Sequence, residues 1–127
     1  MSGPGAPAVE RSAFGAIDQG TTSTRAVRLD ADGRLDTVLQ LDHTMYRPAP
    51  DRVEMDAREL ARNVRACAEA LPDVRALALA NQGESCLAWD ARSGEPLSPV
   101  VSWQDGRTVD SLARMTADGL APEVLAR

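Results

Sequence analysis

Three short apolar segments separated by two polar turns occupy the first third of the chain, at residues 14–17, 25–29 and 35–41. The second turn, Asp30-Ala31-Asp32-Gly33, contains the Asp-Gly pair that is a strong signal for a tight β-hairpin. Short connections of this kind join neighbouring antiparallel strands. The sequence therefore predicts an antiparallel meander of three strands.

A helix is predicted after a proline-rich connection at residues 46–50. Asp56 can cap its first turn, and Glu59 follows at the spacing of a capping box. Pro72 cannot continue a helix and ends it. The apolar residues between these limits recur on one helical face: Leu60, Val64, Cys67, Ala68 and Leu71.

The order of the remaining segments favours an α/β fold. Further strands are expected at 75–80, 86–89 and 100–101, and further helices at 105–115 and 121–125. Strands, a helix and more strands in this order predict a mixed sheet with flanking helices. Residues 1–12 are expected to form a disordered lead-in and residues 13–127 a domain, which we expect to be incomplete because its last helix simply stops.

Composition and charge exclude several classes of function. The formal net charge of −5 argues against a nucleic-acid partner. No apolar run is long enough to cross a bilayer, and the first dozen residues do not resemble a signal peptide. Cys67 and Cys86 form no C-x-x-C pair, which favours reduced thiols in the cytoplasm. The chain has no lysine, so it contains neither a Walker A loop nor a Schiff-base lysine.

The first turn, residues 18–25, carries the strongest chemical signal, and we call it the Thr-rich turn. Asp18 ends the first predicted strand, where a carboxylate can bind Mg²⁺ directly or through water. Gly20 lets the backbone approach an anion, and successive N–H groups in such a turn form an anion-binding concavity. Further donors to phosphate come from Thr21, Thr22, Ser23 and Arg25.

Phosphoryl transfer requires both a metal ligand and phosphate donors, and the Thr-rich turn supplies both. On composition alone, however, an ordinary polar hairpin with an exposed tip explains the same residues slightly better, because such turns are common.

Four segments carry a wider resemblance: AIDQGTTSTRAV at 16–27, YRP with VEMD at 46–56, NQGES with WD at 81–90, and VSWQDGRT at 101–108. In order and spacing they resemble the FGGY family of carbohydrate kinases, most closely its glycerol kinases, over nearly all of the chain from Phe14. The resemblance implies an actin-like, ribonuclease-H-type fold. It also implies transfer of the ATP γ-phosphoryl group to a sugar or polyol hydroxyl, with Asp18 near Mg²⁺ and the Thr-rich turn on the nucleotide phosphates.

The resemblance further implies a substrate site. Glu84 matches an acidic residue that accepts hydrogen bonds from polyol hydroxyls, and Trp103 matches a ring that packs on the carbon face of the substrate. Gln82 is a further candidate contact. Taken singly, Glu84 would more often be a solvated carboxylate, and Trp103 could be a core residue.

Two positions depart from the glycerol kinase pattern. Glycerol kinases carry an arginine at the position of Gly83, so this chain lacks that donor and has extra room for a bulkier polyol or sugar. The segment Asp105-Gly106-Arg107 resembles xylulose and other pentose kinases instead. The substrate therefore stays open between glycerol, another polyol and a ketose.

Three other residues are assigned no chemistry. Trp89 is expected in the core, and Cys86 is expected to be buried packing rather than a nucleophile. His43, the single histidine, is expected to be a surface or half-buried residue, since a metal site would need partners that the sequence does not show.

The resemblance places the catalytic base beyond residue 127, so we expect no catalytic residue in this chain and no kinase activity from it alone. Its expected partners are the remainder of a kinase chain and a small polyol or sugar, and a homo-oligomer stays open. The alternative is a truncated, non-catalytic actin-like module that binds phosphate weakly or serves in protein interaction.

Overall fold

The computed structural model describes residues 14–120, so the predictions for residues 1–12 and 121–125 lie outside the described residues. The chain divides into two compact units. The first comprises Met1–His43 and Glu59–Gln82, and the second comprises Thr44–Arg58 and Gly83–Arg127. Within residues 14–120, no helix is both long enough and apolar enough to span a bilayer.

The first unit is built on a four-stranded sheet of β1 (Phe14–Gln19), β2 (Ser23–Leu29), β3 (Leu35–Asp42) and β6 (Leu77–Asn81). The strand order is β3-β2-β1-β6. The pairs β1–β2 and β2–β3 are antiparallel, which confirms the predicted meander. Strand β6 lies parallel to β1, so the sheet is mixed, as predicted.

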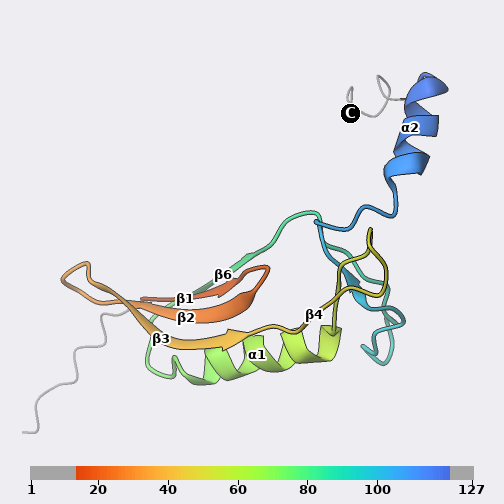
Figure 1. The fold of residues 1–127 in the computed structure, drawn as a ribbon. Helices are drawn as coiled ribbons and strands as arrows, with labels where there is room; N and C mark the ends of the chain where they lie inside the picture. The colour runs from red at the N-terminus through yellow and green to blue at the C-terminus, as the bar shows by residue number, and fades with distance from the viewer. Residues whose placement is uncertain (1–13, 121–127) are drawn as a thin grey trace, which may run out of the picture. The chain divides into compact units, whose positions relative to one another are not determined.

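Helix α1 (Ala57–Glu69) runs along one face of this sheet (Figure 1). Its predicted cap is confirmed, because Asp56 Oδ1 accepts a hydrogen bond of 2.9 Å from the backbone N–H of Arg58. The core between helix and sheet follows the predicted apolar face. Its buried members are Ile17, Ala26, Cys67 and Leu71. Burial of such side chains supplies most of the stabilisation that holds a helix on a sheet.

The second unit contains a small antiparallel sheet that the sequence analysis missed in part. Its strands are β4 (Met45–Tyr46), β5 (Glu54–Met55) and β7 (Val100–Val101), in the order β4-β5-β7. Val53, Met55 and Val100 are buried there. Strands of two residues cannot show an alternating pattern, so only the segment at 100–101 was predicted.

The structure of residues 86–97 differs from two of the predictions. The expected strand at 86–89 is reduced to two isolated bridges, Cys86 with Val101 and Trp89 with Pro96. Trp89 is 62% exposed and Cys86 is also exposed, so the expectation that both are buried was wrong. Apolar character is only a one-way guide to burial, since the surface of a folded protein is itself largely apolar.

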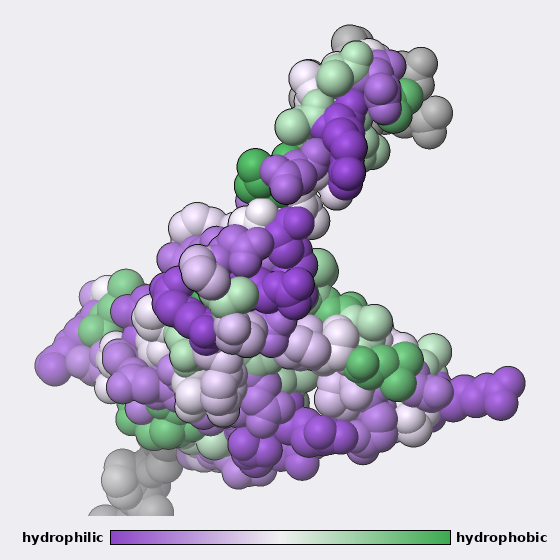
Figure 2. Space-filling model, turned by 45° about the vertical axis from the view of Figure 1, so that its right-hand side comes forward, coloured by the Kyte–Doolittle hydropathy of each residue, from purple (hydrophilic) through white to green (hydrophobic). Residues whose placement is uncertain are grey.

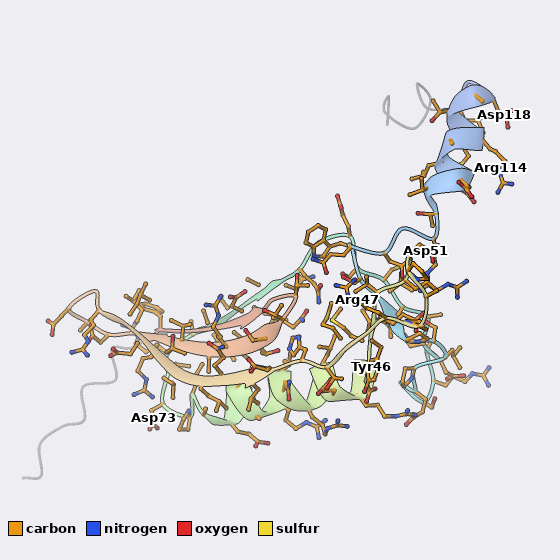
Figure 3. The ribbon with its side chains drawn as sticks, viewed as in Figure 1. Tyr46, Arg47, Asp51, Asp73, Arg114 and Asp118 are labelled. Carbon is orange, nitrogen blue, oxygen red and sulfur yellow. The ribbon has the colours of Figure 1, made fainter. Side chains whose placement is uncertain are left out.

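Helix α2 (Val109–Ala117) begins four residues later than predicted. Two turns precede it: Ser102 O accepts the Asp105 N–H, and Gly106 O accepts the Val109 N–H. Figure 2 shows hydrophobic surface beside polar surface on this helix. Its exposed apolar residues are Val109, Leu112 and Met115. The labelled side chains Arg114 and Asp118 extend outward from it (Figure 3).

Candidate functional site

The Thr-rich turn is the hairpin that joins β1 to β2. Gln19 and Thr24 are register partners, and the Gly20 N–H donates to Ser23 O at 2.9 Å, which sets Thr21 and Thr22 at the tip. A Cβ atom on Gly20 would lie 3.2 Å from the Ser23 carbonyl oxygen, a tight contact that glycine avoids. The predicted hydroxyl groups are therefore gathered at one end of the sheet.

Asp18 and Arg25 lie directly opposite one another in the β1–β2 register. The Arg25 Nη2 donates to Asp18 Oδ2 at 2.6 Å, and both side chains are partly exposed. A carboxylate and a guanidinium thus stand side by side at the surface next to the turn. The first is suited to a hard cation and the second to phosphate oxygens.

Gln82 is brought to the Thr-rich turn by the parallel pairing of β6 with β1. Its backbone N–H donates to Gln19 O at 3.0 Å, and its side-chain Nε2 donates to Gly20 O at 3.4 Å. The sequence named Gln82 as a substrate contact, and in the structure its amide supports the turn.

His43 lies at the same end of the sheet as the turn, although no functional role was predicted for it from the sequence. Its half-burial was predicted, but its contacts were not. Its backbone N–H donates to Thr22 O at 2.8 Å, and its ring nitrogens approach Thr21 O and Thr24 Oγ1. What could have indicated these contacts is the position of His43 directly after Asp42, the residue that pairs with Ser23 in the β2–β3 register.

In the second unit, Glu84 and Trp103 come from two segments that pair in antiparallel fashion. Cys86 and Val101 exchange two backbone hydrogen bonds of 3.0 and 2.8 Å, and Ser85 Oγ accepts the Trp103 N–H at 3.1 Å. The two segments that carry Glu84 and Trp103 therefore lie side by side, and both residues are exposed.

The backbone at Gly83 and Glu84 is unusual in two respects. Glu84 has a φ of 62°, in the left-handed region that a residue with a Cβ atom rarely adopts. Gly83 is exposed, and a Cβ atom built on it would meet nothing within 4 Å. A side chain added at Gly83 would therefore face open space.

A partly buried ion-pair cluster holds the segment that follows Trp103. The Asp105 carboxylate, only 1% exposed, accepts from the Val53 N–H at 2.7 Å and from the Arg107 guanidinium at 2.7 and 2.8 Å. Arg107 also donates to Glu54 Oε1 at 2.6 Å. These hydrogen bonds, chiefly those from Arg107, hold the pKa of Asp105 well below its usual range, and they raise the pKa of Arg107.

Metal-ligating groups are sparse in residues 14–120, where no three side chains of His, Cys, Asp or Glu form a cluster. Asp18 stands beside the candidate phosphate donors of the Thr-rich turn, paired with Arg25. A single carboxylate fits Mg²⁺, because this ion keeps several waters and is commonly held by one or two carboxylates together with substrate phosphates.

The mixed sheet, with its hydroxyl-rich turn between the first two strands, defines an actin-like, ribonuclease-H-type domain. A xylulose kinase from Lactobacillus acidophilus has the same fold, with a TM-score of 0.80 and 16% identity over 91% of this chain and 24% of that one. The structure of Plasmodium falciparum glycerol kinase with ADP matches with a TM-score of 0.73 and 25% identity over 84% of this chain and 23% of that one. The predicted fold class is thus confirmed.

Residues 13–127 match the model of the N-terminal domain of the FGGY family of carbohydrate kinases, and the chain belongs to that family. The glycerol kinase of Methylorubrum populi is 44% identical over 115 residues, which are 84% of this chain. The chain spans 23% of the length of that relative.

Proposed function

We propose that this chain is the amino-terminal part of an ATP-dependent kinase that transfers the γ-phosphoryl group to a hydroxyl of a polyol or sugar. The observation that carries the proposal is the placement of the Asp18–Arg25 pair beside the hydroxyl-rich tip of the β1–β2 hairpin. Membership of the FGGY family supports the reaction class, and the glycerol kinase matched in structure is one described with ADP.

On this proposal the Thr-rich turn binds the nucleotide phosphates. Thr21, Thr22 and Ser23 donate hydroxyl hydrogen bonds, and Arg25 donates its guanidinium N–H groups. Asp18 holds Mg²⁺ directly or through water. When bound, the ion would offset the negative charge of the phosphates, which is its main contribution in phosphoryl transfer.

The Asp18–Arg25 pair fits this role electrostatically. Without ligand, the two charges neutralise one another across 2.6 Å. A magnesium–phosphate complex offers each of them a new partner of opposite sign, so binding leaves no unpaired charge behind. The pair is partly exposed, and exposed ion pairs contribute little to stability. Exchanging the Asp18–Arg25 contact for contacts with the ligand therefore costs little free energy.

Glu84 and Trp103 are proposed to bind the acceptor. A carboxylate accepts from two adjacent hydroxyls, and an indole packs against the C–H face of the same molecule. The open space at Gly83 favours a polyol or sugar larger than glycerol. The pentose alternative rests on Asp105 and Arg107, whose side chains are engaged with Val53 and Glu54.

The general base is proposed to come from residues outside this chain, so the 127-residue polypeptide should turn over no ATP alone. We also place the protein in the cytoplasm, in line with the two free cysteines. Sequencing downstream of codon 127 separates this reading from the non-catalytic module: a continuing frame with a second phosphate motif supports the kinase.

The direct test is a titration of the ¹⁵N-labelled chain with Mg²⁺ and a non-hydrolysable ATP analogue. We expect amide shifts at residues 18–25, abolished by Arg25→Ala. The matched control is Arg34→Ala, which removes the other hairpin ion pair, that with Asp36, and should leave the shifts intact. Absence of shifts in the Thr-rich turn at millimolar analogue would refute the proposal.

Substrate identity needs a second experiment on the polypeptide encoded by the complete reading frame. ATP consumption is measured with glycerol, erythritol, xylulose, ribulose and gluconate. Turnover of a larger polyol or sugar above that of glycerol is the expected result, and strong preference for glycerol would show that Gly83 does not redirect specificity.

A further inference from the structure

We propose that His43 is a positioning residue that pre-orients the Thr-rich turn for phosphate, an inference that rests on the proposed function of that turn. His43 lies one residue beyond β3, next to the β1–β2 hairpin. From there it contacts three of the turn's residues, Thr21, Thr22 and Thr24.

The main chain of His43 makes the first contact. Its N–H donates to Thr22 O at 2.8 Å, which continues the β2–β3 ladder past the Ser23–Asp42 pair. Any residue except proline could make this bond, so it does not require histidine.

The imidazole ring makes the other two contacts. Its Nε2 lies 2.8 Å from Thr24 Oγ1, and its Nδ1 lies 3.4 Å from Thr21 O, a contact longer than an ordinary hydrogen bond. A hydrogen bond to this carbonyl oxygen, which can only accept, requires the proton on Nδ1. In the neutral ring Nε2 then accepts from the Thr24 hydroxyl. One side chain therefore spans two partners that no aliphatic residue could join.

Thr24 connects this arrangement to the core. Its side chain is fully buried, and its carbonyl oxygen accepts a weak hydrogen bond from Cys67 Sγ at 3.8 Å. Cys67 lies in helix α1 and is itself fully buried. The ring of His43 thus ties the exposed tip of the turn to the buried core of the first unit.

The consequence for phosphate follows from peptide geometry. In a trans peptide the carbonyl oxygen and the following N–H point in opposite directions. Because His43 holds Thr21 O and Thr22 O on its own side, the N–H groups of Thr22 and Ser23 are directed to the other side. These are the backbone donors expected of an anion-binding concavity. A turn that is oriented before binding loses less conformational freedom on binding.

The test uses the ¹⁵N-labelled 127-residue chain and three variants of His43. His43→Phe keeps a flat ring and the backbone N–H but removes both ring hydrogen bonds. His43→Gln can keep the acceptor toward Thr24, and His43→Asn can keep the donor toward Thr21. The control is Thr37→Phe, which adds the same ring at an exposed position of β3 away from the turn.

Two quantities are measured: order parameters of the Thr22 and Ser23 amides without ligand, and the Kd for inorganic phosphate and for the Mg²⁺–ATP analogue. In His43→Phe we expect lower order parameters and a Kd raised about tenfold, the factor that corresponds to one ordinary hydrogen bond. The Gln and Asn variants should fall between it and wild type, and Thr37→Phe should match wild type.

The remaining outcomes overturn the inference in distinguishable ways. If wild type and His43→Phe bind phosphate and the ATP analogue equally well, His43 does not position the turn, although the turn still binds phosphate. If His43→Phe lowers the melting temperature but leaves the two amides and the Kd unchanged, His43 is only a structural residue. If wild type binds neither probe, the proposed function fails and the inference fails with it.

Discussion

Replacing Glu84 by glycine should stabilise the second unit while removing a proposed substrate contact. The φ of 62° at Glu84 is left-handed, and this conformation costs a residue with a Cβ atom about 1–2 kcal/mol. Glycine removes that cost but gives the unfolded chain more freedom, which offsets about 0.4–1 kcal/mol. At the centre of these two ranges the expected net gain is about 0.8 kcal/mol in the free energy of unfolding.

Glu84→Ala is the matched variant, because it removes the same carboxylate but keeps the Cβ atom and therefore the strain. It should be about as stable as wild type. Gly83→Ala is the converse control: its backbone is not left-handed and its new Cβ would meet nothing within 4 Å. It should gain about 0.4–1 kcal/mol through the unfolded state.

Urea denaturation followed by tryptophan fluorescence suits this comparison, because both tryptophans, Trp89 and Trp103, lie in the second unit. With an m-value of about 2 kcal/mol/M, the gain for Glu84→Gly moves the midpoint by about 0.3–0.5 M. If Glu84→Gly unfolds at a lower urea concentration than Glu84→Ala, the strain argument is wrong. If Glu84→Gly is more stable and binds polyols as wild type does, the Glu84 carboxylate has no role in binding, and the left-handed backbone only lowers stability.

Three further predictions follow from contacts in the two units. Gly83→Arg should raise glycerol affinity without loss of stability, because nothing lies within 4 Å of the new Cβ; calorimetric titration with glycerol checks this, and unchanged affinity counts against a substrate role for the position. Asp105→Asn should lower the urea midpoint at pH 7. Because Arg107 holds the pKa of Asp105 below its usual range, the stabilisation is complete above about pH 4 and declines as the pH falls below it, so the gap between variant and wild type should narrow at pH 3. A gap that is constant from pH 7 to pH 3 would show that the carboxylate charge is irrelevant. Gly15→Val should cost about 1–3 kcal/mol by overpacking, since even a Cβ would lie 3.0 Å from Leu77 Cδ1 and 3.1 Å from Leu71 Cδ1; a melting temperature equal to that of wild type would mean that this core can yield.

Local patterns predicted the first unit well. The apolar segments at β1, β2 and β3, the Asp-Gly turn and the helical face of α1 all act over a few residues, so periodicity and turn chemistry reveal them. Gly33 has the positive φ of 81° that this turn requires. The turn between β1 and β2 was likewise predicted, because its residues are consecutive in the chain.

The second unit was predicted less well, since its parts are short and distant in sequence. Two-residue strands show no period, and the hairpin at 86–97 exposes Trp89, which hydrophobicity alone had assigned to the core. The expected start of helix α2 at Asp105 failed because Asp105 is used in a partly buried cluster with Val53 and Arg107. Nothing in residues 105–108 alone indicates the contact with Val53.

The sequence by itself therefore determined the family, the mixed sheet and the chemical character of the two sets of candidate residues, because these depend on consecutive residues and repeating patterns. Only the tertiary structure decided how those residues are held. His43 meets Thr24 across 19 residues, Asp105 meets Val53 across 52, and Gln82 meets Gly20 across 62. Contacts at such separations arise from strand register and packing, which no local pattern records.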